Sequence, residues 1–384
     1  MVAARGFEDH EYKTRTTNAQ SRMMELGLTA LLLTTETDVR YFTGFLTRFW
    51  ESPTRPWFIV IPLIGEPIAV IPSIGADLMA GTWISDIRTW QSPDLEDDGV
   101  SLLCDALDEV VPNNGQIGLP DGHETQVRMP LADLMRLQKR LEPRQIVGDH
   151  GILRDLRTIK SEAEIAKIET ACQIAGRAFD RVPEIAKKGE PLDLVFRRFQ
   201  MLCLQEGADW VPYLAGGAEQ GGYSDVISPA SPKELVSGDV LMLDTGMVFD
   251  GYFCDYDRNW SIGRPKHSVA DAFKKLIDAS DAAFELARPG KTAADMFHAM
   301  NNILSVGGPD TGAGRLGHGL GMSLTEWPSF IPTDHTELKP GMVLTLEPGI
   351  AVEGKILVHE ENIVITDNSA RFLSPRAGRE LQEI

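Results

Sequence analysis

The feature that most constrains the fold is a β-hairpin predicted around Asp250-Gly251. The runs DVLMLDTGMVF and YFCDYDRNWSI flank this pair, which is a strong signal for a two-residue turn. With these two residues in the turn, Asp244 lies opposite Asp257, and Asp255 is two residues from Asp257. Because side chains alternate between the two faces of a strand, Asp244, Asp255 and Asp257 then share one face. The hairpin therefore predicts three crowded carboxylates.

Crowded carboxylates need a positive partner. Like charges directly opposite each other destabilise a sheet, and an isolated buried carboxylate has to take up a proton. A bound cation would offset the charge. The alternative is a solvated acidic face with Arg258 as the partner, but the apolar residues Leu243, Val248 and Phe253 disfavour a fully exposed hairpin.

Three further residues with oxygen or nitrogen donors lie downstream in strand-like sequence. His318 lies in LGHGLG, Glu347 in LTLEPG and Glu360 in LVHEENIVIT. Each alone is more often a structural residue. Together with Asp244 and Asp255 they form a set that suits Mn²⁺, Fe²⁺, Co²⁺ or Zn²⁺ better than Ca²⁺. Four carboxylates and one imidazole can hold two divalent ions that share bridging carboxylates.

The chain has 384 residues, which is enough for two domains. Over residues 1–150 strand-like and helix-like runs alternate, which predicts an α/β domain with a central sheet. The turn-rich GDHGILRD marks the boundary, so the predicted domains are residues 1–150 and 151–384. The expected helices are 8–28, 100–111 and 128–141, and the expected strands are 29–35, 57–63 and 68–72.

The second domain contains a weak internal repeat. Residues 179–200 and 284–301 both run helix, glycine, helix, with Gly189 and Gly290 too far apart for a solenoid repeat of about 20–50 residues. This favours two similar halves of one domain, and chance similarity is an equal alternative. Residues 341–366 predict a second strand pair with its bend somewhere in 348–355.

Composition excludes several classes of function. Acidic residues exceed basic ones by 56 to 37, and a net charge of −19 repels nucleic acid and anionic lipid headgroups. Prolines and Glu66 break the most apolar stretch, 57–75, which predicts two strands and no membrane span. The first residues lack the apolar core of a signal peptide, and the 4 cysteines form no CxxC pair. We therefore expect a cytoplasmic protein with reduced thiols.

These motifs resemble the pita-bread superfamily, which includes methionine aminopeptidase, Xaa-Pro aminopeptidase, prolidase and creatinase. RYFTGF (40–45) is similar to the signature of the creatinase-type N-terminal domain, and LRTIKSEAEIAKIETA (156–171) to the opening of the catalytic domain. The resemblance implies a creatinase-like α/β domain, a pita-bread catalytic domain (α+β) with pseudo-twofold symmetry, and a homodimer. It also implies a set of metal ligands, which are Asp244, Asp255, His318, Glu347 and Glu360.

The sequence departs from the superfamily's peptidases on the substrate side. Those peptidases carry a histidine upstream of the first metal aspartate, but residues 223–239 contain none. A second peptidase histidine follows the metal histidine by seven residues, where this chain has Thr325. The usual Asp-x-Thr/Ser-Arg run has Asp257 in place of the hydroxyl residue. Because loss of one stabilising donor costs about 10²–10³ in rate, we do not expect a general peptidase.

A partial resemblance points to a different reaction. The Asp-x-x-Arg-x-Trp run from Asp255 to Trp260, and the Glu-Trp-Pro run that begins at Glu326, are similar to dimethylsulfoniopropionate lyases of this fold. Those lyases have an aspartate base just before Glu-Trp-Pro, where this chain has Thr325. Only short segments are shared, so the substrate does not transfer.

Substrate contacts are predicted from one loop and from aromatic residues near the motifs. GFLTRFWESPTRPW (44–57) is dense in Arg and Trp, and in creatinase-like dimers the N-terminal domain of one subunit covers the other's site. An Arg would hold a carboxylate, and a Trp face a quaternary or sulfonium cation. Packing on the loop's own domain is the equal alternative. The candidates are Arg48, Trp50, Arg55 and Trp57 in the loop, and Trp210, Tyr213 and Trp327 as wall residues that otherwise pack in the core.

Three functions are compatible with this pattern. The leading hypothesis is a dinuclear metallohydrolase of the creatinase and Xaa-Pro dipeptidase type for a small amino-acid-like or zwitterionic substrate, with Asp257 or Glu326 as proton carrier. The second is a lyase in which a carboxylate base removes an α-proton and a leaving group is expelled. The third is a non-catalytic binding protein, against which the complete ligand set argues.

Overall fold

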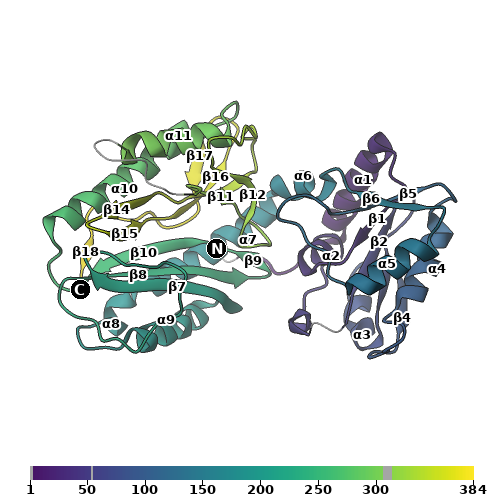
Figure 1. Cartoon of the computed structure of the whole chain (residues 1–384), viewed down its shortest axis with the longest axis horizontal. Helices are drawn as coiled ribbons and strands as arrows, with labels where there is room; N and C mark the ends of the chain where they lie inside the picture. The colour runs from purple at the N-terminus through teal and green to yellow at the C-terminus, as the bar shows by residue number, and fades with distance from the viewer. Residues whose placement is uncertain (1–2, 53–54, 306–313) are drawn as a thin grey trace. The chain divides into compact units, whose positions relative to one another are not determined.

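The computed structural model describes residues 3–52, 55–305 and 314–384 (Figure 1). Its contacts divide the chain into two compact units, residues 5–157 and 158–384, and the N-terminal residues before Arg5 belong to the second. The division lies later than the predicted boundary at residue 150. Helix α6 (Ile152–Thr158) stays with the first unit except for its last residue, and Arg157 forms an ion pair there with Asp38 at 3.0 Å.

The N-terminal unit is built on a six-stranded mixed sheet of order β4-β3-β2-β1-β5-β6. Every residue of β1, β2 and β3 is buried, as expected for strands covered on both faces. The alternation of strand and helix along 1–150 therefore gives the predicted α/β domain. The strands are β1 (Ala30–Leu33), β2 (Phe58–Pro62), β3 (Ile68–Pro72), β4 (Asp86–Trp90), β5 (Gln116–Leu119) and β6 (Gln145–Gly148). The helices are α1 (Asp9–Leu26), α2 (Glu36–Thr43), α3 (Ala76–Ala80), α4 (Val100–Val110) and α5 (Leu131–Arg140), with 3₁₀ turns at Phe49–Glu51 and Ser73–Gly75.

The second unit contains two sheets and a separate hairpin. The first sheet has the order β18-β10-β8-β7 with β9 paired to β8, and the second has the order β12-β11-β13-β16-β17. Their strands are β7 (Trp210–Gln220), β8 (Asp239–Phe249), β9 (Tyr252–Phe253), β10 (Tyr256–Ser261), β18 (Gln382–Glu383), β11 (His318–Gly319), β12 (Glu326–Ser329), β13 (Val343–Leu346), β16 (Glu361–Ile365) and β17 (Ala370–Phe372). The hairpin consists of β14 (Gly349–Val352) and β15 (Lys355–Val358).

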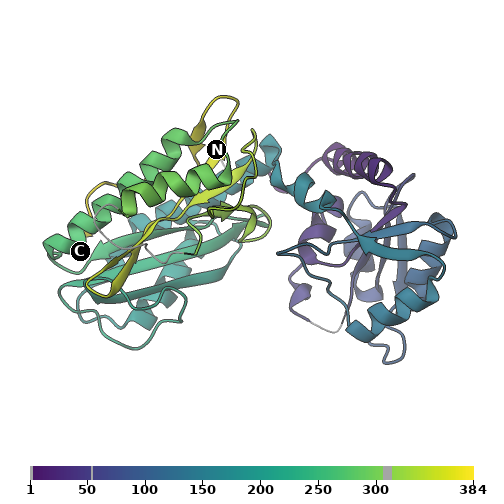
Figure 2. The same cartoon turned by 45° about the horizontal axis from the view of Figure 1, so that its top comes forward.

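Helices cover both sides of these strands. Figures 1 and 2 show α8 and α9 on one side and α10 and α11 on the other. The helices are α7 (Glu162–Asp180), α8 (Val182–Ile185), α9 (Leu192–Glu206), α10 (His267–Leu286) and α11 (Ala293–Leu304). Among the described residues no helix is long and apolar enough to cross a membrane.

The two halves of this unit follow the same order of helix, glycine, helix and strands. Gly189 and Gly290 both have the left-handed backbone conformation, with φ of 89° and 84°. Each lies shortly before a helix, α9 or α11. The first half opens with the predicted capping box of Ser161 and Glu164. The weak repeat in the sequence thus corresponds to a repeated order of helix, glycine, helix and strands in the structure.

The predicted hairpin register is present, and so is the second predicted strand pair, whose turn lies inside the predicted 348–355. Asp244 pairs with Asp257 across β8 and β10, although the chain leaves the ladder between β9 and β10. Residues 341–366 form β13 and β16 with the β14–β15 hairpin inserted between them. This hairpin turns at Glu353 and Gly354, both with positive φ, as a tight two-residue turn requires.

Candidate metal centre

The five predicted metal ligands come from both sheets of the second unit. Asp244 lies on β8 and Asp255 in the break before β10. His318 begins β11, Glu347 directly follows β13, and Glu360 directly precedes β16. The β13–β16 register pairs the last residue of β13 with the first of β16, so Glu347 and Glu360 follow opposite each other at the end of the ladder. Asp244 thus lies in the middle of a strand, and the other four predicted ligands lie at or beside strand ends.

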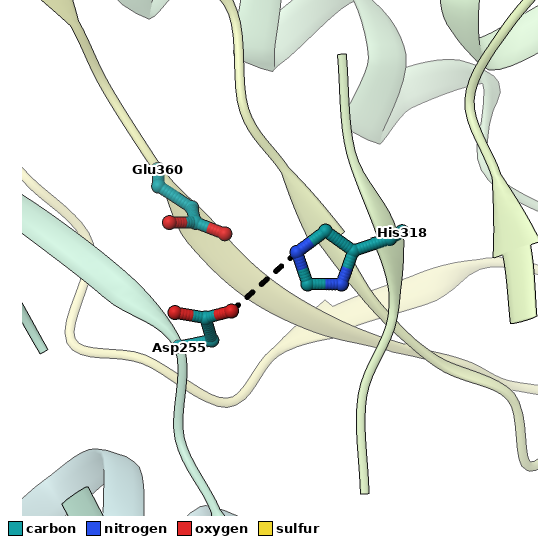
Figure 3. A group of neighbouring side chains, drawn as sticks. All are labelled: Asp255, His318 and Glu360. Carbon is teal, nitrogen blue, oxygen red and sulfur yellow. Dashed lines mark ion pairs between the residues drawn. The ribbon is translucent and has the colours of Figure 1, made fainter. Parts of the chain in front are cut away.

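Three of the ligands already form a compact group. One donor atom each from Asp255, His318 and Glu360 lie within 4.8 Å of one another. Figure 3 shows the three side chains pointing toward one another, with His318 Nε2 3.4 Å from Asp255 Oδ2. All three are buried, with exposures of 5%, 2% and 3%. This arrangement can hold a metal ion.

The imidazole of His318 is in the form that binds metals. Burial, together with the nearby charge of Arg315, lowers the pKa of His318 to about 4, so the ring is neutral at pH 7. Its Nδ1 lies 2.8 Å from the carbonyl oxygen of Gly319, so Nδ1 carries the proton and donates to it. The lone pair is then left on Nε2, which faces Asp255.

The carboxylates of the cluster repel one another. Burial and neighbouring carboxylates raise the pKa values of Asp244, Asp255 and Glu360 well above the ordinary range. Burial also raises the pKa of Glu347 to about 7, against the opposing effect of Arg315. A divalent cation in their midst would favour the ionised forms and reverse these shifts.

Unpartnered oxygen atoms support the same interpretation. Asp244 Oδ1 and Glu360 Oε1 are buried and have no hydrogen-bond partner among the described residues. The other Asp244 oxygen, Oδ2, accepts a hydrogen bond from the Tyr213 hydroxyl at 3.0 Å. A buried acceptor without a donor costs free energy, and a metal ion would compensate it. Oxygen and imidazole donors are those of a transition-metal site, so the residues present fit the predicted ions.

Asn362 holds Asp255 in place, and the sequence patterns did not indicate it. The backbone N–H of Asp255 donates to Asn362 Oδ1 at 3.0 Å, and the Asn362 amide donates back to the Asp255 carbonyl oxygen. These bonds satisfy backbone groups of Asp255, which lies between β9 and β10. Cys172 also donates to Asn362 Oδ1, at 3.3 Å. The only sequence signal was the place of Asn362 two residues after Glu360.

Asp257 belongs to a buried charge network that includes another residue the patterns missed, His359. His359 Nδ1 lies 3.6 Å from Asp257 Oδ1, and its Nε2 lies 3.4 Å from Glu361 Oε1. Burial opposes a charged imidazole, but these two carboxylates raise the pKa of His359. Burial would likewise raise the pKa of Glu361, but Arg258 and His359 lower it to about 2.

Glu326, the other predicted proton carrier, forms a buried ion pair. Its Oε2 lies 2.9 Å from Lys160 Nζ, and both side chains are 2% exposed. Its Oε1 accepts the backbone N–H of Ser323 at 3.1 Å. Lys160 was not indicated by any motif. The roles of Asp257 and Glu326 in proton transfer stay predictions.

The substrate-side candidates separate into two groups. Tyr213 donates to the predicted ligand Asp244, whereas Trp210 on β7 and Trp327 on β12 are partly buried. In the N-terminal loop Trp57 is 1% exposed and packs on Trp50, which is 9% exposed. Burial of these two tryptophans favours the packing alternative, and their contact with a substrate stays a prediction.

The predicted role of Arg48 and Arg55 in binding a substrate carboxylate stays a prediction. Arg48 is half-exposed and pairs with Glu51 at 2.6 Å. Arg55 donates to Ser92 and Ser52. Residues 53 and 54 of the loop lie outside the described residues.

Arg315 is a cation beside the cluster that the patterns also missed. It lies three residues before His318, is partly buried, and donates from Nη2 to Thr325 Oγ1 at 3.2 Å. Its charge lowers the pKa values of Asp255 and Glu347. Within the described ranges it forms no ion pair at 4.0 Å or less.

Comparisons with known proteins agree with this architecture. The sequence profile of metallopeptidase family M24 matches residues 166–367, and that of the creatinase/prolidase N-terminal domain matches residues 15–159. The probable dipeptidase PepE of Mycobacterium tuberculosis is 28% identical over 367 residues, covering 95% of this chain and 94% of that protein. The Xaa-Pro dipeptidase of Pyrococcus horikoshii is 31% identical over 262 residues, covering 66% of this chain and 72% of that protein.

Solved structures show the same fold over the whole chain. The dipeptidase PepE of Mycobacterium ulcerans superposes with a TM-score of 0.85 at 27% identity and covers 99% of both chains. The prolidase of Pyrococcus horikoshii superposes with a TM-score of 0.83 at 24% identity, covering 96% of this chain and 99% of that one. The two domains therefore have the creatinase-like and pita-bread architecture that the sequence motifs implied.

Proposed function

The chain belongs to metallopeptidase family M24, and on that premise we propose that it hydrolyses a small amino-acid-like or zwitterionic substrate at a dinuclear centre. The ligands of that centre would be Asp244, Asp255, His318, Glu347 and Glu360. The observation that carries the proposal is the buried cluster of four carboxylates and one neutral imidazole, in which two carboxylate oxygens lack a partner. Divalent ions bound there supply Lewis acidity and a water-derived nucleophile at neutral pH.

The chain's own residues hold this centre in shape. The Gly319 carbonyl fixes the ring of His318 with Nε2 toward Asp255, and Asn362 fixes the backbone of Asp255. Burial raises the pKa of Tyr213, so its hydroxyl stays protonated and donates to Asp244. These contacts orient the ligands before any substrate binds, as precise metal sites require.

A carboxylate on the substrate is supported by Arg315. A guanidinium has five N–H donors, and Arg315 uses one of them on Thr325. The remaining donors suit a carboxylate, which an arginine binds with two parallel hydrogen bonds. Relatives named dipeptidase or Xaa-Pro dipeptidase support a substrate of this size. We therefore propose that Arg315 binds the carboxylate group of the substrate.

Replacing Arg315 by alanine is expected to raise KM for carboxylate substrates by about 10–100-fold, because a hydrogen bond to a charged group contributes about 1.5–3 kcal/mol. Steady-state kinetics with a dipeptide and its C-terminal amide provide the measurement. The amide lacks the charge that Arg315 would bind, so the variant and the wild type should process it alike. An equal loss of kcat/KM for both substrates contradicts the assignment.

The function itself is tested by activity and by the origin of the product oxygen. Dipeptides containing proline, creatine, betaines and sulfonium acids should be screened against protein loaded with Mn²⁺, Fe²⁺ or Zn²⁺. In ¹⁸O-water a hydrolase product carries one labelled oxygen, whereas a lyase product carries none. Full activity in chelator, with clearly less than one ion per subunit by elemental analysis, would show that the proposal is wrong. The expected homodimer and cytoplasmic location stay predictions.

A further inference from the structure

Asp257 lies beside the metal centre without belonging to the five ligands. It stands opposite Asp244 in the ladder between β8 and β10. Its Oδ1 accepts a hydrogen bond from the backbone N–H of Glu360 at 3.1 Å. Asp257 therefore touches elements that carry ligands in both sheets, and its side chain is 1% exposed.

The side-chain contacts of Asp257 all involve one of its two carboxylate oxygens, Oδ1. Oδ1 also accepts from the Asn259 amide at 3.4 Å and lies 3.6 Å from His359 Nδ1. Oδ2 is buried and has no hydrogen-bond partner among the described residues. A buried acceptor without a donor costs about 1–3 kcal/mol. A role as the partner of His359 alone leaves that cost uncompensated.

Among the described residues, the buried carboxylate oxygens without a hydrogen-bond partner all lie in this region. They are Asp244 Oδ1, Asp257 Oδ2 and Glu360 Oε1. Two other buried carboxylates nearby have basic partners, since Glu361 pairs with Arg258 and Glu326 with Lys160. Asp244 and Glu360 are proposed metal ligands, so Asp257 shares the one property that distinguishes them from the paired carboxylates.

We propose that Asp257 is a sixth ligand of the metal centre, through Oδ2. The inference rests on the dinuclear centre proposed above. Five carboxylates and one imidazole form an oxygen-rich donor set, which suits Mn²⁺. Five carboxylates exceed the charge of two divalent ions by one. Arg258, which pairs with Glu361, also lies beside the centre. Its guanidinium donates to the backbone carbonyl oxygens of Asp257, at 2.6 Å, and Glu360, at 3.1 Å.

The test compares Asp257→Asn with Glu361→Gln. Both substitutions remove one buried charge from the same network while keeping the side-chain shape, but Glu361 Oε1 and Oε2 already have partners. Wild-type protein is titrated with Mn²⁺ by electron paramagnetic resonance and with Co²⁺ by visible absorption. Loss of a residue that only hydrogen-bonds to a ligand lowers metal affinity by about 10–100-fold. Asp257→Asn should therefore lower the affinity for one of the two ions by more than about 100-fold, and Glu361→Gln should lower it by less.

The Co²⁺ spectrum separates a ligand from a supporting residue. We expect Asp257→Asn to change the visible bands, because the coordination of one ion changes, and Glu361→Gln to leave them as in the wild type. Identical spectra and affinities for Asp257→Asn and wild type overturn the inference, and so does an equal shift in both variants. Circular dichroism of the metal-free proteins confirms folding.

A third variant, Asp255→Asn, keeps the two proposals apart. It should lose tight binding of metal if the dinuclear centre exists at all. If Asp255→Asn binds Mn²⁺ as the wild type does, the proposed function fails and the inference fails with it. If Asp255→Asn loses tight binding of Mn²⁺ but Asp257→Asn binds it as the wild type does, the inference alone fails.

Discussion

Replacing His318 by alanine is expected to abolish the thermal stabilisation that Mn²⁺ gives to the wild-type protein. The folded metal-free chain buries carboxylates whose pKa values are raised by burial and mutual repulsion, so a cation that binds only the folded state should stabilise it. At a free Mn²⁺ concentration of 100 times Kd, the bound ion should raise the free energy of unfolding by about 2.7 kcal/mol. For a unit of this size the melting temperature should rise by about 5–10 °C.

The variant removes the only imidazole of the donor set, and the measurement is calorimetry with and without Mn²⁺. Hydrolysis should be lost together with the stabilisation, because both depend on the same ligand. His298→Ala is the matched control, since His298 lies exposed on α11 outside the cluster. A His318→Ala protein that still gains the wild-type shift in melting temperature would exclude His318 as a ligand.

The second large effect is expected for Lys160→Met, which should lower the free energy of unfolding by about 3–5 kcal/mol. Lys160 and Glu326 are both 2% exposed, and their charged atoms lie 2.9 Å apart. Removing the ammonium leaves a buried carboxylate without its counter-ion, and that carboxylate must stay unpaired or take up a proton. Urea unfolding monitored by fluorescence measures the change.

Two further variants make this prediction specific. In Lys160→Met with Glu326→Gln the unpaired charge is gone, so most of the stability should return. Lys13→Met removes an exposed pair with Asp9 and should change stability by less than about 1 kcal/mol. If Lys160→Met unfolds at the wild-type urea concentration, the pair does not stabilise the fold and the prediction is wrong.

Local sequence signals predicted much of the fold. The Asp250-Gly251 turn and the alternation of side chains fixed the register that places Asp244 opposite Asp257. The capping box at Ser161 marked the start of α7. These predictions succeeded because turn conformations, caps and strand alternation depend on residues only a few positions apart. The same five residues follow as predicted metal ligands from the residue pattern and from the resemblance.

Packing over long distances decided what the local patterns left open. Trp50 and Trp57 were predicted either to contact a substrate or to pack on their own domain, and their mutual packing inside the N-terminal unit favours the second alternative. Residues 341–366 form the predicted strand pair with a turn inside 348–355, but the pairing is divided between β13–β16 and the inserted β14–β15 hairpin. Local propensity did not indicate this division.

The sequence by itself determined the donor types, the hairpin that crowds the aspartates and the order of the ligands. Only the tertiary structure decided what supports them: Asn362 bonds to Asp255 across 107 positions, and Lys160 to Glu326 across 166. The unpartnered oxygen of Asp257 likewise became visible only when every neighbouring donor had been placed. A residue's type reports which bonds it can form. Which bonds it does form depends on segments that the fold brings together and that no short-range pattern connects.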